Sequence, residues 1–170
     1  SDFIVEFFVL NEVEVALKDQ ISLTTNAPVY LLDTESILKL STLVNNQIGL
    51  AVVQQKQFSP FKINDCYTIV LDGIRDPGNL GTIIRICDWY GVNQLVMSPD
   101  CTDFFNPKVI SASMGSYVRV RFAYMELADL FATNKDIPVY GALLNGDDIH
   151  KTIFPKTSFL LFGNESNGIR

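Results

Sequence analysis

Residues 72–92 combine an amide, an arginine and glycines in a pattern that could bind a ligand. Gly81, Arg85 and Asp88 are spaced i, i+4, i+7, so a helix would place them on one face, apart from its apolar side chains. A glycine inside a helix lowers helix stability by about 1 kcal/mol relative to alanine. One reason to accept this cost at Gly81 would be to clear room one turn from Arg85. Asn79 would lie at the helix start, where N–H groups and an arginine suit a ribose phosphate.

A simpler interpretation of this segment stays open. Arg85 could pair with Asp88 on a solvated helix face, and Asn79 could do no more than cap the helix. The glycines by themselves are weakly informative, because they form neither a Walker A loop nor a GxGxxG dinucleotide motif.

The second segment with chemical potential is residues 158–170, where an apolar strand ends in Gly163, Asn164 and Glu165, with Gly168 shortly after. Gly163 would let a ligand approach the backbone closely, and Glu165 would emerge at the carboxyl end of the strand. The alternative is that Asn164 or Ser166 caps a helix and Glu165 lies favourably beside its dipole.

Both segments belong to a repeating pattern that would position them. Helical patterns at 79–92, 106–116 and 125–135 separate apolar strand patterns at 66–74, 93–99, 117–124, 137–144 and 158–165. Strands that alternate with helices predict βαβ crossovers and a parallel sheet, in which ligands bind beyond the carboxyl ends of the strands. Both segments follow such carboxyl ends.

The amino-terminal part predicts a separate, smaller unit. Residues 28–33 and 47–55 have strand patterns, and a helix between them would start at Thr34 or Asp33 as its N-cap. Polar residues and a proline follow near residue 60, which is typical of a linker. We therefore predict a small α/β domain over residues 1–57, a linker over 58–66 and a second domain over 67–170.

The composition limits the classes of function. With 48% hydrophobic and 19% charged residues, the chain should fold, and no apolar run approaches the roughly 20 residues of a membrane helix. Three cysteines without metal-ligand spacing predict free thiols, no metal and a cytoplasmic location. A net charge of −6 argues mildly against nucleic acid, so an RNA partner would need a local basic patch. Arg119 and Arg121, expected to alternate along one strand face, are candidates for it, unless they serve only solubility.

The two segments together resemble motifs one and two of the SpoU (TrmH-type) family of RNA ribose methyltransferases, in the SPOUT superfamily. Motif one has an Asn-x5-Arg pattern, matched by Asn79 and Arg85. Motif two has a Gly-Asn-Glu core followed by a glycine, matched by residues 163–168. The resemblance covers residues 67–170, and a weaker one relates residues 2–55 to the small substrate-binding domain of the family.

The resemblance implies a Rossmann-like SPOUT domain with a parallel sheet, but one family motif is unmatched. The third motif, a Ser/Asn-rich turn and helix, has no counterpart before Arg170. In the family that segment forms a C-terminal trefoil knot and completes the cofactor pocket and the dimer interface. We therefore expect this chain to be incomplete at its carboxyl end, and its first domain to be incomplete at the amino end.

The activity implied is methyl transfer from S-adenosylmethionine to a ribose 2′-hydroxyl of rRNA or tRNA. Arg85 would stabilise the alkoxide as it forms, because a guanidinium hardly ever loses its proton. Asn79 would orient Arg85 or the ribose, and Glu165 would fix Arg85 or the motif-two loop. The residues implied for the cofactor pocket are Leu143, Gly163, Asn164 and Gly168. The residues expected to contact RNA are Arg75, Arg85, Lys108, Arg119 and Arg121.

The expected partners are RNA and a second copy of the chain, with no membrane and no metal. Ribosomal RNA is favoured over transfer RNA, because an extra amino-terminal domain suits such substrates in this family. One alternative is a non-catalytic RNA-binding relative of the same fold. Another is a nucleotide-dependent oxidoreductase, which would need the GxGxxG loop that this sequence lacks.

Overall fold

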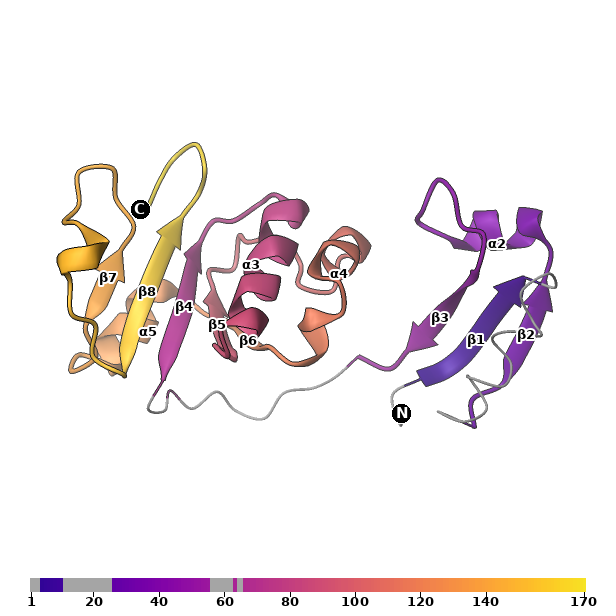
Figure 1. The fold of residues 1–170 in the computed structure, drawn as a ribbon, viewed down its shortest axis with the longest axis horizontal. Coiled ribbons are helices and arrows are strands. Elements are labelled where there is room, and N and C mark those ends of the chain that lie inside the picture. Colours follow the sequence, from indigo (N-terminus) through magenta and orange to yellow (C-terminus); the bar gives the residue numbers. More distant parts are fainter. Residues whose placement is uncertain (1–3, 11–25, 56–62, 64–65) are drawn as a thin grey trace. The chain divides into compact units, whose positions relative to one another are not determined.

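The computed structural model describes residues 4–10, 26–55, 63 and 66–170, which belong to two units divided between Gln57 and Phe58 (Figure 1). The predicted linker over residues 58–66 therefore lies, apart from Ile63 and Cys66, outside the described residues. No helix in the described ranges combines the length and the hydropathy that a membrane crossing requires.

The first unit holds a three-stranded mixed sheet and one described helix. The central strand pairs parallel with one neighbour and antiparallel with the other, in the order β2-β1-β3. Its elements are β1 (Ile4–Leu10), β2 (Val29–Leu32), α2 (Thr34–Leu40) and β3 (Gly49–Val53). Of the two caps considered for α2, Asp33 is the one used, since its carboxylate accepts from the Ser36 N–H at 2.8 Å. Strand β1 was not predicted.

The second unit is a five-stranded parallel sheet, as the alternating pattern predicted. Its order is β6-β5-β4-β8-β7, and every neighbouring pair is parallel. The strands are β4 (Tyr67–Asp72), β5 (Gln94–Met97), β6 (Arg121–Tyr124), β7 (Val139–Gly141) and β8 (Ser158–Gly163). The helices are α3 (Pro77–Trp89), α4 (Pro107–Ser113), η2 (Ser116–Val118), α5 (Leu127–Thr133) and η3 (Ile149–Lys151). The Rossmann-like fold class is thus confirmed, whereas the trefoil knot stays a prediction.

Helices cover the central strand on both faces, which explains its unbroken apolar run. Ile69 and Leu71 point into one cluster with Leu80 and other residues of α3 and α4. Val70, which faces the other way, packs in a second cluster with Leu130 of α5. Figure 1 shows α3 and α4 side by side against the sheet.

The strand order places a switch point between β4 and β8. From β4 the chain adds β5 and β6 on one side, and β8 later enters on the other side between β4 and β7 (Figure 1). In open α/β sheets the crevice outside the carboxyl ends at such a switch point is where ligands bind. The two segments singled out in the sequence begin here, directly after Asp72 and Gly163.

Helix α4 packs directly against Gly81 of α3. A Cβ at this position would lie 2.5 Å from the Ala112 Cβ and 2.9 Å from the Val109 carbonyl oxygen. The idea that Gly81 clears room for a ligand near Arg85 is therefore wrong, because helix α4 fills that room. Gly91, with φ of +70°, ends α3 as predicted.

We expect Gly81→Ala to destabilise the second unit by about 1–3 kcal/mol, the usual cost of forcing a methyl group into a packed contact. The measurement is the free energy of unfolding in denaturant. Gly146→Ala is the control and should stay within about 0.5 kcal/mol, because its Cβ would meet nothing closer than the Leu143 carbonyl oxygen at 3.4 Å.

Adding Ala112→Gly to Gly81→Ala should restore part of the lost stability, since it removes the methyl group with which the new one collides. Full wild-type stability in Gly81→Ala alone would contradict this account of the helix contact.

Candidate active site

Helix α3 begins with a capped turn that leaves the Asn79 side chain available. The Asp76 carboxylate accepts from the Asn79 backbone N–H at 2.7 Å, so Asp76 is the N-cap and Asn79 is not. The Asn79 side chain instead donates from Nδ2 to Oε2 of Glu165 at 3.3 Å. The structure thus brings together two residues that lie 86 positions apart in the sequence.

Asn164 organises the loop that carries Glu165. Its backbone N–H and carbonyl pair with those of Gly168, both at 2.9 Å. Its Oδ1 accepts from the N–H groups of Ser166 and Asn167, and its Nδ2 donates to the Gly73 carbonyl at 2.8 Å. The alternative in which Asn164 or Ser166 caps a helix is therefore wrong, because Asn164 closes a turn within residues 164–168.

Gly163 is required by the protein's own backbone. A Cβ here would lie 2.2 Å from the Gly168 carbonyl carbon and 2.4 Å from the Ile169 nitrogen. The close approach predicted at Gly163 exists, but the group that approaches is the returning loop and not a ligand. Gly168 contributes a φ of +71°, which favours glycine.

Arg85 lies exposed in the middle of α3, with no hydrogen bond or ion pair among the described residues. Six residues of helix separate it from Asn79, which amounts to about 9 Å along the axis and about 120° around it. Within one chain, the structure therefore does not bring Arg85 to the Asn79–Glu165 pair.

The proposed pairing of Arg85 with Asp88 is wrong, because Asp88 binds Arg119. The Arg119 Nε and Nη2 donate to the two Asp88 oxygens at 2.8 and 2.6 Å. The hydrogen bonds from Arg119 hold the pKa of Asp88 below its ordinary value. Arg119 follows η2 and precedes β6, so the predicted alternation of Arg119 and Arg121 along one strand is also wrong.

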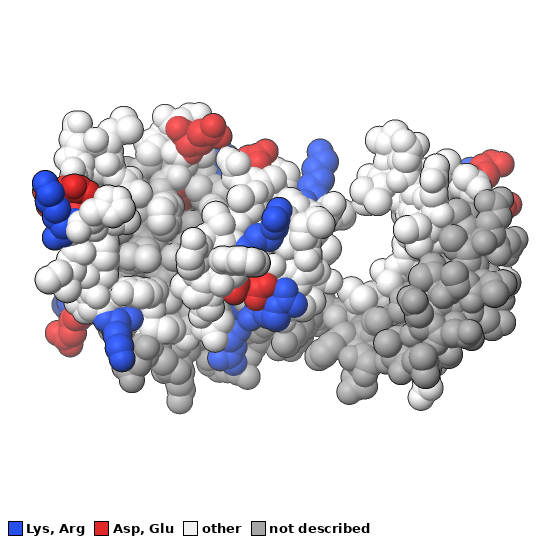
Figure 2. Space-filling model, viewed as in Figure 1, with Lys and Arg blue, Asp and Glu red and all other residues white. Residues whose placement is uncertain are grey.

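The five residues expected to contact RNA do not form one cluster. Arg121 starts β6 and Arg119 precedes it, so both lie at the amino ends of the strands, opposite the Asn79–Glu165 pair. Arg75 follows β4 and its Nη2 lies 3.4 Å from an Asp100 oxygen, while Lys108 is exposed on α4. In Figure 2 the Lys and Arg side chains on the second unit form separate groups with uncharged surface between them.

An ion-pair network that was not predicted lies beside the site. Asp72, buried at the end of β4, accepts from the Arg170 backbone N–H at 2.7 Å and from its Nε and Nη2 at 3.0 and 2.6 Å. The Arg170 Nη2 also donates to Asp100 at 2.8 Å, and the Ser98 hydroxyl donates to the same Asp100 oxygen at 2.7 Å. Arg170 and Ser98 together lower the pKa of Asp100 to about 2.

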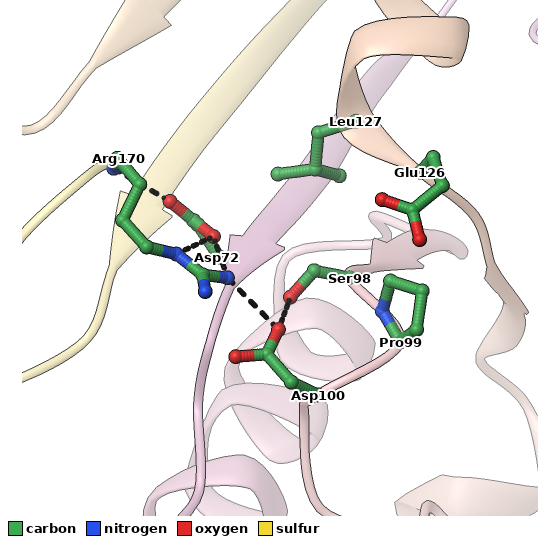
Figure 3. Close-up of a pocket in the computed structure, with 7 residues that line it drawn as sticks. All are labelled: Asp72, Ser98, Pro99, Asp100, Glu126, Leu127 and Arg170. Carbon is green, nitrogen blue, oxygen red and sulfur yellow. Dashed lines mark hydrogen bonds and ion pairs between the residues drawn. The ribbon is translucent and has the colours of Figure 1, made fainter.

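These residues line a hollow of about 500 Å³ at the carboxyl ends of the strands (Figure 3). The Arg170 guanidinium points toward Asp72 and Asp100 on one side of it, and Leu127 lies across from them. The lining residues are Asp72, Ser98, Pro99, Asp100, Glu126, Leu127 and Arg170. The sequence offered one signal for this network, an aspartate that directly ends an otherwise apolar strand.

The family model that matches is that of the SpoU rRNA Methylase family, over residues 67–170. The chain belongs to this family. The matched residues contain both segments singled out in the sequence, with Asn79 in one and Glu165 in the other. The resemblance predicted from the two motifs is therefore confirmed.

Curated relatives of this SpoU chain are named as rRNA 2′-O-methyltransferases. RlmP of Bacillus subtilis, the 23S rRNA (guanosine(2553)-2′-O)-methyltransferase, is 32% identical over 104 residues, or 59% of this chain. RlmB of Neisseria meningitidis, a 23S rRNA (guanosine-2′-O-)-methyltransferase, is 29% identical over 108 residues, or 60% of this chain. Each match covers 42% of the relative, so the chain spans less than half the length of these two proteins.

Solved structures agree on the fold. A TrmH-family protein from Porphyromonas gingivalis superposes with a TM-score of 0.81 at 31% identity, covering 98% of this chain and 67% of that one. The SpoU methyltransferase AviRb from Streptomyces viridochromogenes, in complex with AdoMet, gives a TM-score of 0.82 over 98% of this chain and 68% of that one. At 21% identity, the AviRb match shows the fold alone.

The residues predicted to line a cofactor pocket lie at the ends of two neighbouring strands of this SpoU domain. Leu143 follows β7, and its side chain is 64% exposed. Gly163 ends β8, which pairs with β7. The N–H groups of Asn164 and Gly168 already bond to each other's carbonyls, so they are not free to bind a ligand. Among the described residues, no group of three His, Cys, Asp or Glu side chains could hold a metal ion.

The low pKa of Asp100 predicts a pH dependence of stability. Since this pKa is about 2 in the folded protein against an ordinary 3.8, the ionised carboxylate stabilises the fold above about pH 4, and that contribution is lost as the pH falls toward 2. We expect the free energy of unfolding to fall less between pH 5 and pH 3 in Asp100→Asn than in the wild type. Denaturant titrations at several pH values measure it, and equal pH dependence in the two proteins would rule out this role for Asp100.

Proposed function

We propose that the protein containing this chain transfers a methyl group from S-adenosylmethionine to a ribose 2′-hydroxyl of RNA. The observation that carries the proposal is the contact between Asn79 Nδ2 and Glu165 Oε2, which joins the two family motifs at the switch point of the sheet. The names of RlmP and RlmB support both the reaction and ribosomal RNA as its substrate.

The residues at the ends of β7 and β8 fit the cofactor. Leu143 offers an exposed apolar side chain for a flat ring, and it lies beside the loop that starts at Gly163. When bound there, S-adenosylmethionine supplies a methyl group on a sulfonium whose leaving group is a neutral thioether. The protein therefore has to align the ribose hydroxyl and to manage its proton.

Arg85 and Asn79 have distinct roles toward that hydroxyl. Arg85 stabilises the oxygen as negative charge develops on it. Its guanidinium group does not act as a base, because it hardly ever loses its proton. A phosphate of the RNA next to the ribose accepts the hydroxyl proton. Asn79 is held by Glu165 through Nδ2, and its Oδ1 has no hydrogen bond among the described residues, so Oδ1 is free to orient the hydroxyl.

We further propose that the site forms between two copies of the chain, in a cytoplasmic homodimer. Arg85 lies about 9 Å along α3 and about 120° around it from Asn79, which disfavours the action of both side chains on one ribose oxygen within a single chain. A second copy related by a two-fold axis can present its own Arg85 to the Asn79–Glu165 pair.

We expect Arg85→Ala in the natural full-length protein to lower kcat about 100- to 1,000-fold, the size of effect that follows when a charge-stabilising donor is lost. The assay is transfer of labelled methyl groups from S-adenosylmethionine to unmodified rRNA and tRNA. Lys135→Met, which removes an exposed lysine that has no ion pair among the described residues, is the control and should keep wild-type activity.

The RNA that becomes labelled identifies the substrate class. An Arg85→Ala protein with undiminished activity would contradict the role of Arg85. A folded wild-type protein that binds RNA, but that neither binds S-adenosylmethionine nor transfers label to RNA, would overturn the enzyme proposal. It would favour a non-catalytic RNA-binding relative.

Complementation tests whether two copies share the site. Arg85→Ala and Glu165→Gln should each keep no more than about 1% of wild-type activity. Their co-expression should recover about one quarter of it, because half of the dimers are mixed and one of their two sites is intact. Co-expression that recovers nothing, with mixed dimers present on a native gel, would place Arg85 and Glu165 in the same chain's site.

A further inference from the structure

We propose that Arg170 is a positioning residue for the reaction above: by binding Asp72 and Asp100, it fixes the 164–168 loop so that Glu165 meets Asn79. The proposal rests on the proposed function for its kinetic consequences. Its structural consequence, the placement of Glu165, can be measured without any activity.

Arg170 anchors the end of the 164–168 loop to Asp72 through both its backbone and its side chain. Both oxygens of Asp72 are engaged, Oδ2 by the Arg170 backbone N–H and Oδ1 by the Nε and Nη2 of its side chain. Asp72 is only 3% exposed and ends the central strand, so it is a fixed partner. A buried carboxylate needs such pairing, because an unpaired charge is costly to bury.

The start of the loop is anchored to Gly73, the residue that follows Asp72. The Asn164 side chain donates to the Gly73 carbonyl at 2.8 Å, and the Gly73 N–H donates to the Ser98 hydroxyl at 2.8 Å. The loop is therefore tied at one end to Asp72 and at the other to Gly73. Glu165 lies between these two anchors, and its contact with Asn79 depends on both.

Arg170 also bonds to Asp100, which follows β5 (Figure 3). Asp100 accepts from Arg170 at 2.8 Å and from the Ser98 hydroxyl at 2.7 Å, which joins the end of β5 to the same cluster. The Arg170 side chain is 56% exposed, so its bonds to the two aspartates, and not burial in the core, define its contribution. That combination suits a residue that orients a loop.

The experiment uses the natural full-length protein and a double-mutant cycle between Arg170→Met and Glu165→Gln. Arg170→Met alone should lower kcat about 10- to 100-fold, as misplacement of a group by about 1 Å does, with little change in the KM for RNA. In the Glu165→Gln background it should cause no further loss, because the group that it positions is already disabled. Arg170→Lys should recover part of the loss, since a lysine keeps the charge near Asp72 but cannot form the same set of hydrogen bonds.

A spectroscopic readout separates positioning from general damage to the fold. The side-chain amide resonance of Asn79, the donor to Glu165, should shift in Arg170→Met as it does in Glu165→Gln, and should not shift in Lys135→Met. All rates and spectra are compared below the melting temperature of each variant.

Two outcomes overturn the proposal: an unmoved Asn79 resonance in Arg170→Met, or losses of kcat that simply add in the double mutant. The failure of the proposed function looks different. If the wild-type protein methylates no RNA but the Asn79 resonance still shifts in Arg170→Met, Arg170 remains the residue that places Glu165. Only the reaction assigned to the site would then be removed.

Discussion

The parallel pairing of β4 with β8 is the interaction on which the rest of the second unit depends. It joins segments about 90 residues apart with six consecutive residue pairs, and its last pair is Asp72 with Gly163. Both strands therefore end at the same level, and the loops that follow them start side by side. Burial of the apolar residues of β4 on both faces offsets the entropy lost in closing so long a stretch of chain.

The strand ends then determine how the polar groups are used. The backbone groups of Gly73, Asn164 and Gly168 bond to the protein itself, and so do both oxygens of Asp72. Asn79 and Glu165 are among the side chains that stay exposed in the segments after these strands. A site in which the supporting groups are satisfied internally holds the outward ones in place before any ligand arrives, which is the preorganisation that catalysis by alignment requires.

The sequence was sufficient for the elements whose signals are local. Strands β4 and β8, helix α3 and its end at Gly91 follow from apolar runs and helical spacing, and their alternation predicts the parallel sheet. Strand β1 was missed because a short apolar stretch does not distinguish a strand from a helix when its partners lie far along the chain.

What the sequence could not supply was the identity of the atoms that meet across the fold. Gly81 and Gly163 were singled out as places where a ligand could approach, but the groups that they accommodate are Ala112 and the backbone at Gly168. The Asp72–Arg170 pair joins residues 98 positions apart, and no local pattern marks it. Such contacts depend on how distant strands and helices pack together, and no local pattern in the sequence specifies that packing.

Ion pairs also reduce the positive charge that the protein can offer to a nucleic acid. Three of the five arginines, Arg75, Arg119 and Arg170, lie within ion-pair distance of aspartates, so they contribute little net positive field. The exposed cations without an ion pair among the described residues are Arg85, Lys108, Arg121, Lys135 and Lys156. Nucleic-acid affinity grows with the number of phosphates that a protein neutralises. A small number of unpaired cations therefore favours recognition by shape and by the aligned site over general electrostatic attraction. A net charge of −6 is therefore compatible with the RNA substrate proposed above, provided that the unpaired cations act at defined phosphates.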